Sequence, residues 1–143
     1  MWTRKILVAY DGSAPSRRAL ELAAQVAGAD PTVELVLAHV VRLFSSGAAA
    51  AGIDAVIMDD AASVRAELEA VAEMLPNPAE VRLLRGTSPA DLIVSCAIEE
   101  GCDLIVMGSR GQGGVKGYLG SVSYAVTKES PVTVLIAKDG ARQ

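Results

Sequence analysis

Short apolar runs recur along the chain, and longer stretches with a helical period of apolar residues separate them. Most of these runs are nearly continuous, which is typical of strands buried on both faces. The run at 80–86 alternates instead and predicts a less buried edge strand. The longer stretches set apolar residues three and four positions apart, with charged residues opposite. The pattern predicts strands at 5–10, 33–41, 80–86, 103–107 and 132–137, and helices at 13–28, 54–75, 88–101 and 120–129.

Two of the predicted helices begin with recognisable start signals. Ser13 follows the first strand and can cap the first helix with its hydroxyl. Ser88, Pro89 and Asp91 occupy the N-cap, first and third positions of the third helix, where these residue types are favoured. The segment 42–54 is rich in small residues and lacks a clear period, so we interpret it as a mobile connection.

The alternation of strands and helices predicts an α/β fold. Helices of ten residues or more between strands imply right-handed crossovers, a parallel sheet and helices on both of its faces. We therefore expect one doubly wound domain over residues 1–143. Such sheets bind ligands at the carboxyl ends of the strands, where the winding direction reverses. If the first strand neighbours the fourth, "YDGS" (10–13) and "GSRG" (108–111) meet in one crevice.

Composition narrows the possible functions. Hydrophobic residues make up 51% of the chain, but with one Phe, one Trp and three Tyr the core must be aliphatic, and no base-stacking platform is available. A formal net charge of −4 argues against non-specific binding to nucleic acid or to an anionic membrane surface. No apolar stretch approaches the roughly 18 residues of a membrane span. We expect a cytoplasmic protein.

The residues that most often carry catalysis or metals are scarce. Five residues separate Cys96 from Cys102, and a structural zinc site needs about four ligands, whereas the single histidine, His39, lies far away in sequence. We expect two buried, reduced thiols and a packed histidine with its polar atoms satisfied. No nucleophile, base and orienting group can be assembled from these residues, so the sequence favours binding over catalysis and predicts no metal ligands.

The segment 108–121, "GSRGQGGVKGYLGS", carries six glycines in fourteen positions. It is either a flexible strand-to-helix turn or a loop whose amides, followed by a helix N-terminus, bind an anion. The buried strand before it and the Gly-Ser pair at the helix start favour the anion site. Arg110 and Lys116 can neutralise phosphate charge, and Ser121 and Ser123 can add hydroxyl donors. The spacing matches neither a Walker A loop nor a G-x-G-x-x-G fingerprint.

Asp11 stands at the carboxyl end of the first strand, opposite the glycine segment in the expected fold. A short carboxylate at this position can accept a hydrogen bond from a ribose hydroxyl or an adenine amino group. It can equally cap the turn formed by Gly12 and Ser13. The sequence leaves both roles open.

Taken together, these stretches resemble the universal stress protein family. The resemblance rests on "KILVAYDGS", "VLAHVV", "DLIVMGSRG", "LGSVS" and "PVTVLIAK", which occur in the family's order over almost the whole chain. It implies a five-stranded parallel sheet of order 3-2-1-4-5, of the Rossmann-like, adenine nucleotide alpha hydrolase-like type. It also implies homodimers joined through the last strand, here Val132–Ala137.

One branch of that family binds ATP and carries the pattern G-x2-G-x9-G-[ST]. Both ends of the pattern are present here, but eight residues rather than nine separate Gly111 from Gly120. A missing residue removes at most ~3.3–3.6 Å of chain reach, which we expect to favour AMP or ADP over ATP. The nucleotide-binding residues that the resemblance implies are Ala9, Tyr10, Asp11, Val40, Gly108, Arg110, Gly111, Gly120, Ser121, Val122 and Ser123.

Three functions remain open from the sequence. The first is a stress-response regulatory protein in which bound adenine nucleotide, ATP or AMP or ADP with or without Mg²⁺, changes the loop and a partner surface. The second is a slow ATPase in which Arg110 and Lys116 stabilise phosphoryl transfer. The third is a nucleotide-free interaction module of the same family. We favour the first.

Overall fold

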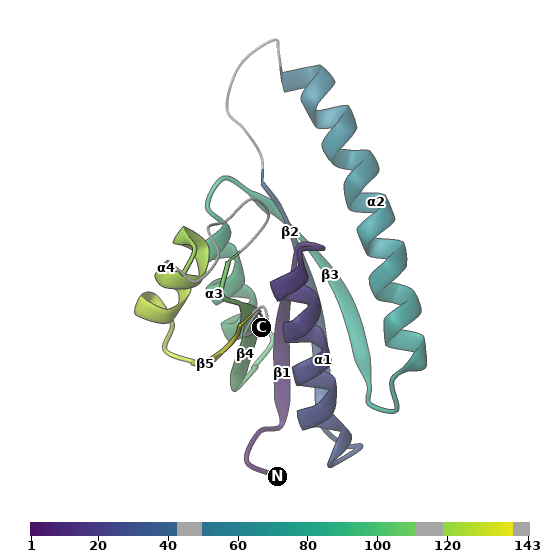
Figure 1. Cartoon of the computed structure of the whole chain (residues 1–143), viewed down its shortest axis with the longest axis vertical. Helices are drawn as coiled ribbons and strands as arrows, with labels where there is room; N and C mark the ends of the chain where they lie inside the picture. Colours follow the sequence, from purple (N-terminus) through teal and green to yellow (C-terminus); the bar gives the residue numbers. More distant parts are fainter. Residues whose placement is uncertain (43–49, 111–118, 139–143) are drawn as a thin grey trace, which may run out of the picture.

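A computed structural model describes residues 1–42, 50–110 and 119–138 of the chain. Its centre is a five-stranded sheet in the order β3-β2-β1-β4-β5 (Figure 1). Every pairing between neighbouring strands is parallel. The sequence predicted this architecture and strand order. The strands are β1 (Lys5–Tyr10), β2 (Glu34–Arg42), β3 (Ala79–Gly86), β4 (Leu104–Gly108) and β5 (Thr133–Ala137).

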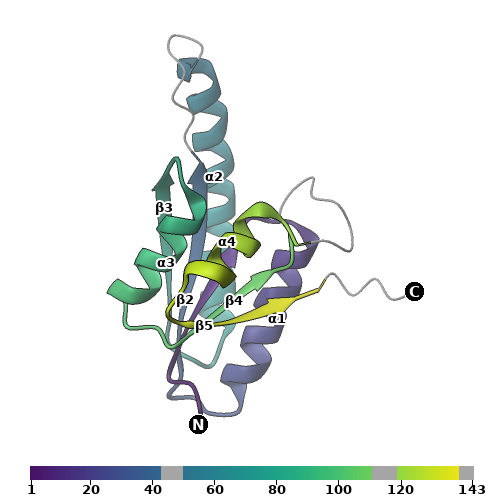
Figure 2. The same ribbon diagram turned by 90° about the vertical axis from the view of Figure 1, so that its left-hand side faces the viewer.

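Helices cover both faces of the sheet. Figures 1 and 2 show α1 and α2 on one face and α3 and α4 on the other. The winding direction reverses between β1 and β4, because the chain builds β2 and β3 on one side of β1 and then crosses to build β4 and β5 on the other. The helices are α1 (Ala14–Gly28), α2 (Ala50–Met74), α3 (Pro89–Glu99) and α4 (Ser121–Glu129).

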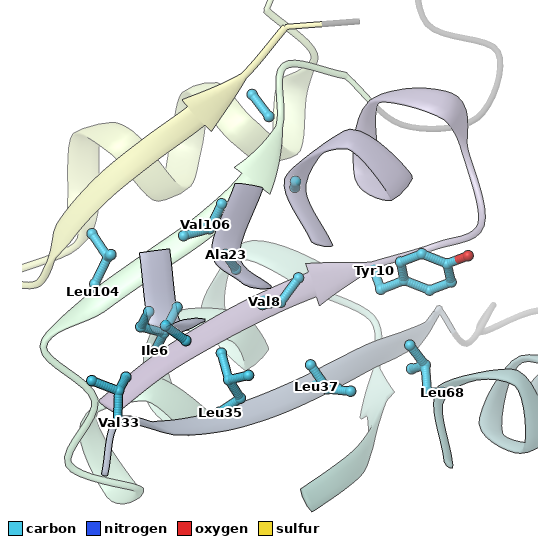
Figure 3. Packing of buried hydrophobic residues seen from close by; sticks show 13 residues of the cluster. Ile6, Val8, Tyr10, Ala23, Val33, Leu35, Leu37, Leu68, Leu104 and Val106 are labelled. Atoms are coloured by element: carbon cyan, nitrogen blue, oxygen red, sulfur yellow. The ribbon is translucent and has the colours of Figure 1, made fainter. Parts of the chain in front are cut away.

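The alternating side chains of the central strands form two aliphatic cores. Ile6 and Val8 of β1 pack with α1 and α2 (Figure 3), whereas Leu7 and Ala9 pack with α3 and α4. Burial on both faces explains why these strands appear in the sequence as continuous apolar runs. The edge strand β3 is only half buried along most of its length, as its alternating pattern predicted.

The predicted helix starts are correct in position but differ in their hydrogen bonds. Ser13 caps α1, and its Oγ accepts from the Ser16 N–H at 3.3 Å. Ser88 occupies the N-cap of α3, yet within the described residues its side chain makes no capping bond. Its hydroxyl donates to the Asp91 carboxylate at 3.0 Å, a hydrogen bond to a charged acceptor.

The interpretation of 42–54 as a mobile connection is wrong in its second half. Residues 43–49 lie outside the described residues, but α2 begins at Ala50 rather than at Asp54. The small residues that obscured the period include several alanines, which have the highest helix propensity, so they extend the helix. No helix in the described ranges is long and apolar enough to cross a membrane.

Candidate functional site

A cleft of about 420 Å³ opens at the carboxyl ends of β1 and β4, where the winding direction of the sheet reverses. Every predicted site residue that the structure describes lines this cleft. Gly111 was also predicted and lies outside the described residues, as does Lys116. The predicted residues that line the cleft are Ala9, Tyr10, Asp11, Val40, Gly108, Arg110, Gly120, Ser121, Val122 and Ser123.

The lining also includes Ser16, Pro89, Ile93 and Met107, which the sequence reasoning missed. Pro89 and Ile93 are four residues apart and therefore share one face of α3. The sequence could have indicated both residues, because α3 starts directly after β3 and its first turn must therefore lie at the carboxyl edge of the sheet. Ser16 was missed because it lies in the first turn of α1, where a serine has no distinctive sequence pattern.

Part of the cleft lining is apolar. Ala9, Ile93 and Met107 belong to the buried core on the α3 and α4 face, and Val40 and Val122 pack against it. These aliphatic side chains give a flat, uncharged ligand group a place away from water. Such a lining with a few polar groups is characteristic of small-molecule sites.

Another part of the lining comes from the two ends of the glycine segment. The Ser109 carbonyl accepts from the Gly120 N–H at 2.8 Å and from the Ser123 hydroxyl at 2.7 Å. The Ser109 N–H donates to the carbonyl of Ala137 in β5 at 2.9 Å. These bonds close the segment at its base, so the end of β4 and the start of α4 meet whatever path residues 111–118 take.

Ser123, which the sequence predicted as a hydroxyl donor to the ligand, lines the cleft but uses its hydroxyl proton within the protein. Its side chain is buried with 2% exposure, and its hydroxyl proton is directed at backbone carbonyls. Ser121 is exposed at the rim of the cleft, which leaves its hydroxyl accessible to a ligand.

Three helices, α1, α3 and α4, have first-turn residues in the cleft lining, and their N-termini differ in how the backbone donors are used. α3 begins with Pro89, which has no N–H to offer. In α1 the Ser13 hydroxyl accepts from Ser16, and the Asp11 carboxylate accepts from the Ser13 N–H at 2.9 Å. In the described part of the chain no side chain caps α4, because its N-cap is Gly120. The helix dipole therefore favours an anion more at α4, whose first-turn N–H groups lack a side-chain acceptor within the described residues, than at α1, where a carboxylate is already present.

Asp11 performs the capping role that the sequence left open, and it also lines the cleft. Its Oδ1 holds the turn in which Gly12 has a φ of 83°, a left-handed conformation that favours glycine. One oxygen of this carboxylate is thus engaged with the protein while the residue faces the ligand space.

Tyr10 contributes to the cleft through its backbone. Its side chain lies on the opposite face of the sheet, in the core under α1 and α2, and its hydroxyl donates to the Glu67 carboxylate. Burial, followed by the hydrogen bond with Glu67, raises the pKa of Tyr10 above 10.0. Figure 3 shows the ring at the end of β1 with its hydroxyl directed away from Val8.

His39 is packed and hydrogen-bonded, as predicted. It is 8% exposed, and its Nδ1 lies 2.9 Å from the Tyr10 carbonyl oxygen. A carbonyl can only accept, so Nδ1 carries the proton and donates. His39 is not among the residues that line the cleft.

Gly108 has a packing role that the sequence did not indicate. A Cβ at this position would lie 2.7 Å from both the backbone carbon and the Cβ of Pro15, and 2.9 Å from the Ser16 nitrogen. The first turn of α1 therefore sits directly against the end of β4. The glycine allows this contact between backbones, which brings the α1 end of the cleft close to the glycine segment.

The two thiols are buried and free, as expected. Burial raises the pKa of Cys102 to about 12 and raises that of Cys96 above its usual value. A thiol in this state is not the thiolate that nucleophilic or metal chemistry requires. Among the described residues there is also no group of three or more His, Cys, Asp or Glu side chains that could hold a metal ion.

Comparison with known proteins agrees with the fold and the motifs. The model of the Universal stress protein family matches residues 3–138. A universal stress protein encoded in the QAH/OAS sulfhydrylase 3′ region of Thermus aquaticus is 36% identical over 142 residues, covering 94% of this chain and 98% of its own.

Solved structures give the same result. The hypothetical protein MJ0577 superposes with a TM-score of 0.84 at 27% identity, over 94% of this chain and 95% of its own. A universal stress protein in complex with cAMP is 28% identical with a TM-score of 0.62, over 96% of this chain and 98% of its own. The chain belongs to the universal stress protein family.

Proposed function

We propose that this protein binds an adenine nucleotide in the cleft between β1 and β4 and acts as a regulatory switch. The observation that carries the proposal is that the cleft is lined both by aliphatic side chains and by Arg110, Ser121 and the uncapped N-terminus of α4. A nucleotide likewise combines a flat base with an anionic phosphate. The relative that is 28% identical and holds cAMP supports this ligand class.

The ligand orientation follows from the chemistry of these two kinds of lining. The base lies among Ala9, Val40 and Met107, where it is shielded from water. The phosphate lies at the first turn of α4, where backbone N–H groups and the helix dipole favour an anion. The ribose then lies between them, near Asp11, whose carboxylate accepts from a hydroxyl group.

AMP or ADP is the preferred ligand in this proposal. The glycine segment is one residue shorter than the pattern of the ATP-binding branch, and the polar part of the lining offers fewer donors than predicted because Ser123 bonds to the backbone. Any Mg²⁺ arrives with the phosphates, since the described residues offer no dedicated acidic cluster.

A regulatory role fits the cleft better than catalysis. Among the described residues that line it, the ionisable side chains belong to Tyr10, Asp11 and Arg110. Tyr10 is directed to the far face, and one oxygen of Asp11 accepts from Ser13. A slow ATPase would need a base to activate water, and His39 does not line the cleft.

We also propose a homodimer formed through β5. This strand is an edge of the sheet, and its central residues Val134, Leu135 and Ile136 are only half buried. An exposed apolar edge strand pairs readily with another strand, and a second copy supplies one. Sedimentation that finds only monomer at micromolar concentration would contradict this arrangement.

Titration calorimetry with AMP, ADP and ATP tests the proposed ligand. We expect binding by the wild type, strongest for AMP or ADP, and binding weakened at least ~10-fold in Arg110→Ala. Arg18→Ala is the matched control, because Arg18 is exposed on α1, pairs with Glu21 and does not line the cleft. A clear preference for ATP would rule out the AMP or ADP assignment, and unchanged affinity in Arg110→Ala would rule out the phosphate site.

Two further measurements separate the alternatives. Heat denaturation of freshly purified protein, followed by measurement of adenine absorbance in the supernatant, reveals nucleotide that was carried through purification. Absence of binding in both experiments would favour the nucleotide-free interaction module. Sustained phosphate release from ATP that is lost in Arg110→Ala would favour the slow ATPase.

A further inference from the structure

The peptide that joins Tyr10 to Asp11 occupies a particular place in the fold. Tyr10 and His39 form the last pair in the register between β1 and β2. The chain then leaves the sheet through Asp11 and turns at Gly12 with a φ of 83°. Both Tyr10 and Asp11 line the cleft, so the orientation of this peptide sets the orientation of the cleft wall.

The peptide is held from both sides. On the β2 side, the Nδ1–H of His39 donates to the Tyr10 carbonyl at 2.9 Å. On the α1 side, the Asp11 N–H donates to the Ser16 hydroxyl oxygen at 3.3 Å. Carbonyl and N–H belong to one planar unit, so these two bonds together fix its rotation.

Ser16 can act as the acceptor because its own proton is used elsewhere. Its hydroxyl donates to the Ser13 carbonyl at 3.0 Å, which directs an oxygen lone pair toward Asp11. His39 and Ser16 together form a clamp on the Tyr10–Asp11 peptide. Both side chains are buried, with exposures of 8% for His39 and 4% for Ser16. Buried groups of this kind are costly to leave unpaired, so the clamp resists rearrangement.

We infer that His39 and Ser16 are positioning residues that orient the Asp11 carboxylate toward a ligand with neighbouring hydroxyl groups, that is, a ribose. The inference rests on the proposed function. His39 acts through the Tyr10–Asp11 peptide and does not touch the ligand. The carboxylate is held at one oxygen by the Ser13 N–H, and the clamp fixes the backbone from which it projects.

The test compares ligands that differ only in the ribose. The affinities of AMP and of 2′,3′-dideoxy-AMP are measured for the wild type, Asp11→Ala, His39→Leu, His39→Asn and Ser16→Ala. We expect the wild type to prefer AMP by ~10-fold or more, as for hydrogen bonds to a charged acceptor, and Asp11→Ala to lose this preference. His39→Leu and Ser16→Ala should lose most of it.

His39→Asn provides the rescue. Its amide nitrogen lies near the position of Nδ1 and can still donate to the Tyr10 carbonyl, so it should retain the preference for AMP that His39→Leu loses. In an Asp11→Ala background, His39→Leu should have no further effect on the ratio of the two affinities. Ser130→Ala is the control, because it removes hydrogen bonds to Val132 in the turn before β5 and should leave the ratio unchanged.

A second measurement does not depend on the ligand. Amide hydrogen exchange at Asp11 should be faster in His39→Leu and Ser16→Ala than in the wild type and in His39→Asn. If both variants keep the wild-type ratio while Asp11→Ala loses it, the inference is overturned and the proposed function stands. If the wild type binds neither nucleotide, both are overturned.

Discussion

The hydroxyl of Ser123 in α4 donates to the carbonyl of Ser109 at the end of β4, over a distance of 2.7 Å. The same carbonyl accepts from the Gly120 N–H, so the two halves of the glycine motif are joined by their backbone before any ligand binds. These bonds hold the end of β4 against the start of α4, so this part of the cleft wall is formed by residues on either side of the segment 111–118. This explains how a short loop remains compatible with an intact cleft.

Replacing the two serines of α4 should separate stability from binding. Ser123→Ala removes a buried hydrogen bond and should lower the free energy of unfolding by about 1 kcal/mol. Ser121→Ala should leave stability unchanged, because its side chain is exposed, and should weaken nucleotide binding several-fold. Urea denaturation and calorimetry on both variants measure these effects. A stable Ser123→Ala variant with lost binding would mean that Ser123 contacts the ligand directly.

Gly108→Ala should destabilise the protein through packing. The added Cβ would collide with the backbone of Pro15 and Ser16, which cannot move as a side-chain end can. Such overpacking typically costs about 1–3 kcal/mol, and thermal unfolding measures it.

Gly28→Ala is the matched control for that substitution. No described atom lies within 4 Å of a Cβ at this last position of α1. Alanine is a better helix former, so the change should be neutral or stabilising by up to about 1 kcal/mol. A similar loss of stability in both variants would argue against the collision.

Tyr10→Phe should reduce stability without affecting the ligand. The variant loses the hydrogen bond to Glu67, which is exposed and can be solvated by water, so we expect a loss of about 1 kcal/mol. The backbone of Tyr10 that lines the cleft is unchanged, so the affinity for AMP should be within about twofold of the wild type. A large loss of affinity would mean that the phenol ring itself reaches the ligand.

Stability should fall at acid pH in part through Asp103. Its carboxylate accepts from the Thr3 hydroxyl and from the Arg4 N–H at 2.9 Å. Burial raises its pKa, but these hydrogen bonds outweigh that effect and hold the pKa below the ordinary 3.8. The ionised carboxylate therefore stabilises the fold above that pH, and the contribution is lost as the pH falls through the folded-state pKa.

The comparison that isolates this contribution is between the wild type and Asp103→Asn. The variant should unfold at lower urea concentration at neutral pH, and the difference should shrink as the solution is acidified. A difference that stays constant down to strongly acidic pH would show that charge is not its source.

The two thiols should report on unfolding. Burial raises the pKa of Cys102 to about 12, and Cys96 is also buried, so an aromatic disulfide reagent near pH 8 should react with neither in the folded protein. Both should react once urea unfolds the chain, and AMP should slow the reaction by stabilising the folded state. Rapid reaction of either thiol in the native protein would contradict this prediction.

The periodicity of the sequence by itself determined the strands and their parallel arrangement, because buried strands and crossover helices have strong periodic signals. The strand order, and with it the reversal point between β1 and β4, came from the resemblance to the family and agrees with the structure. The sequence also identified polar residues of the cleft lining, since Gly108 and Arg110 lie at the end of a buried strand and Gly120 precedes the next helix. It misjudged the start of α2, because an alanine-rich stretch has high helix propensity but no amphipathic period.

Only the tertiary structure decided which polar groups remain accessible to a ligand. Ser121 and Ser123 look alike in sequence, yet the second is buried and bonded to Ser109. Likewise, Gly108 lies directly against Pro15. His39 donates a hydrogen bond to the carbonyl of Tyr10, 29 positions away along the chain. These roles depend on contacts between residues that are distant in sequence, and local patterns carry no information about such partners.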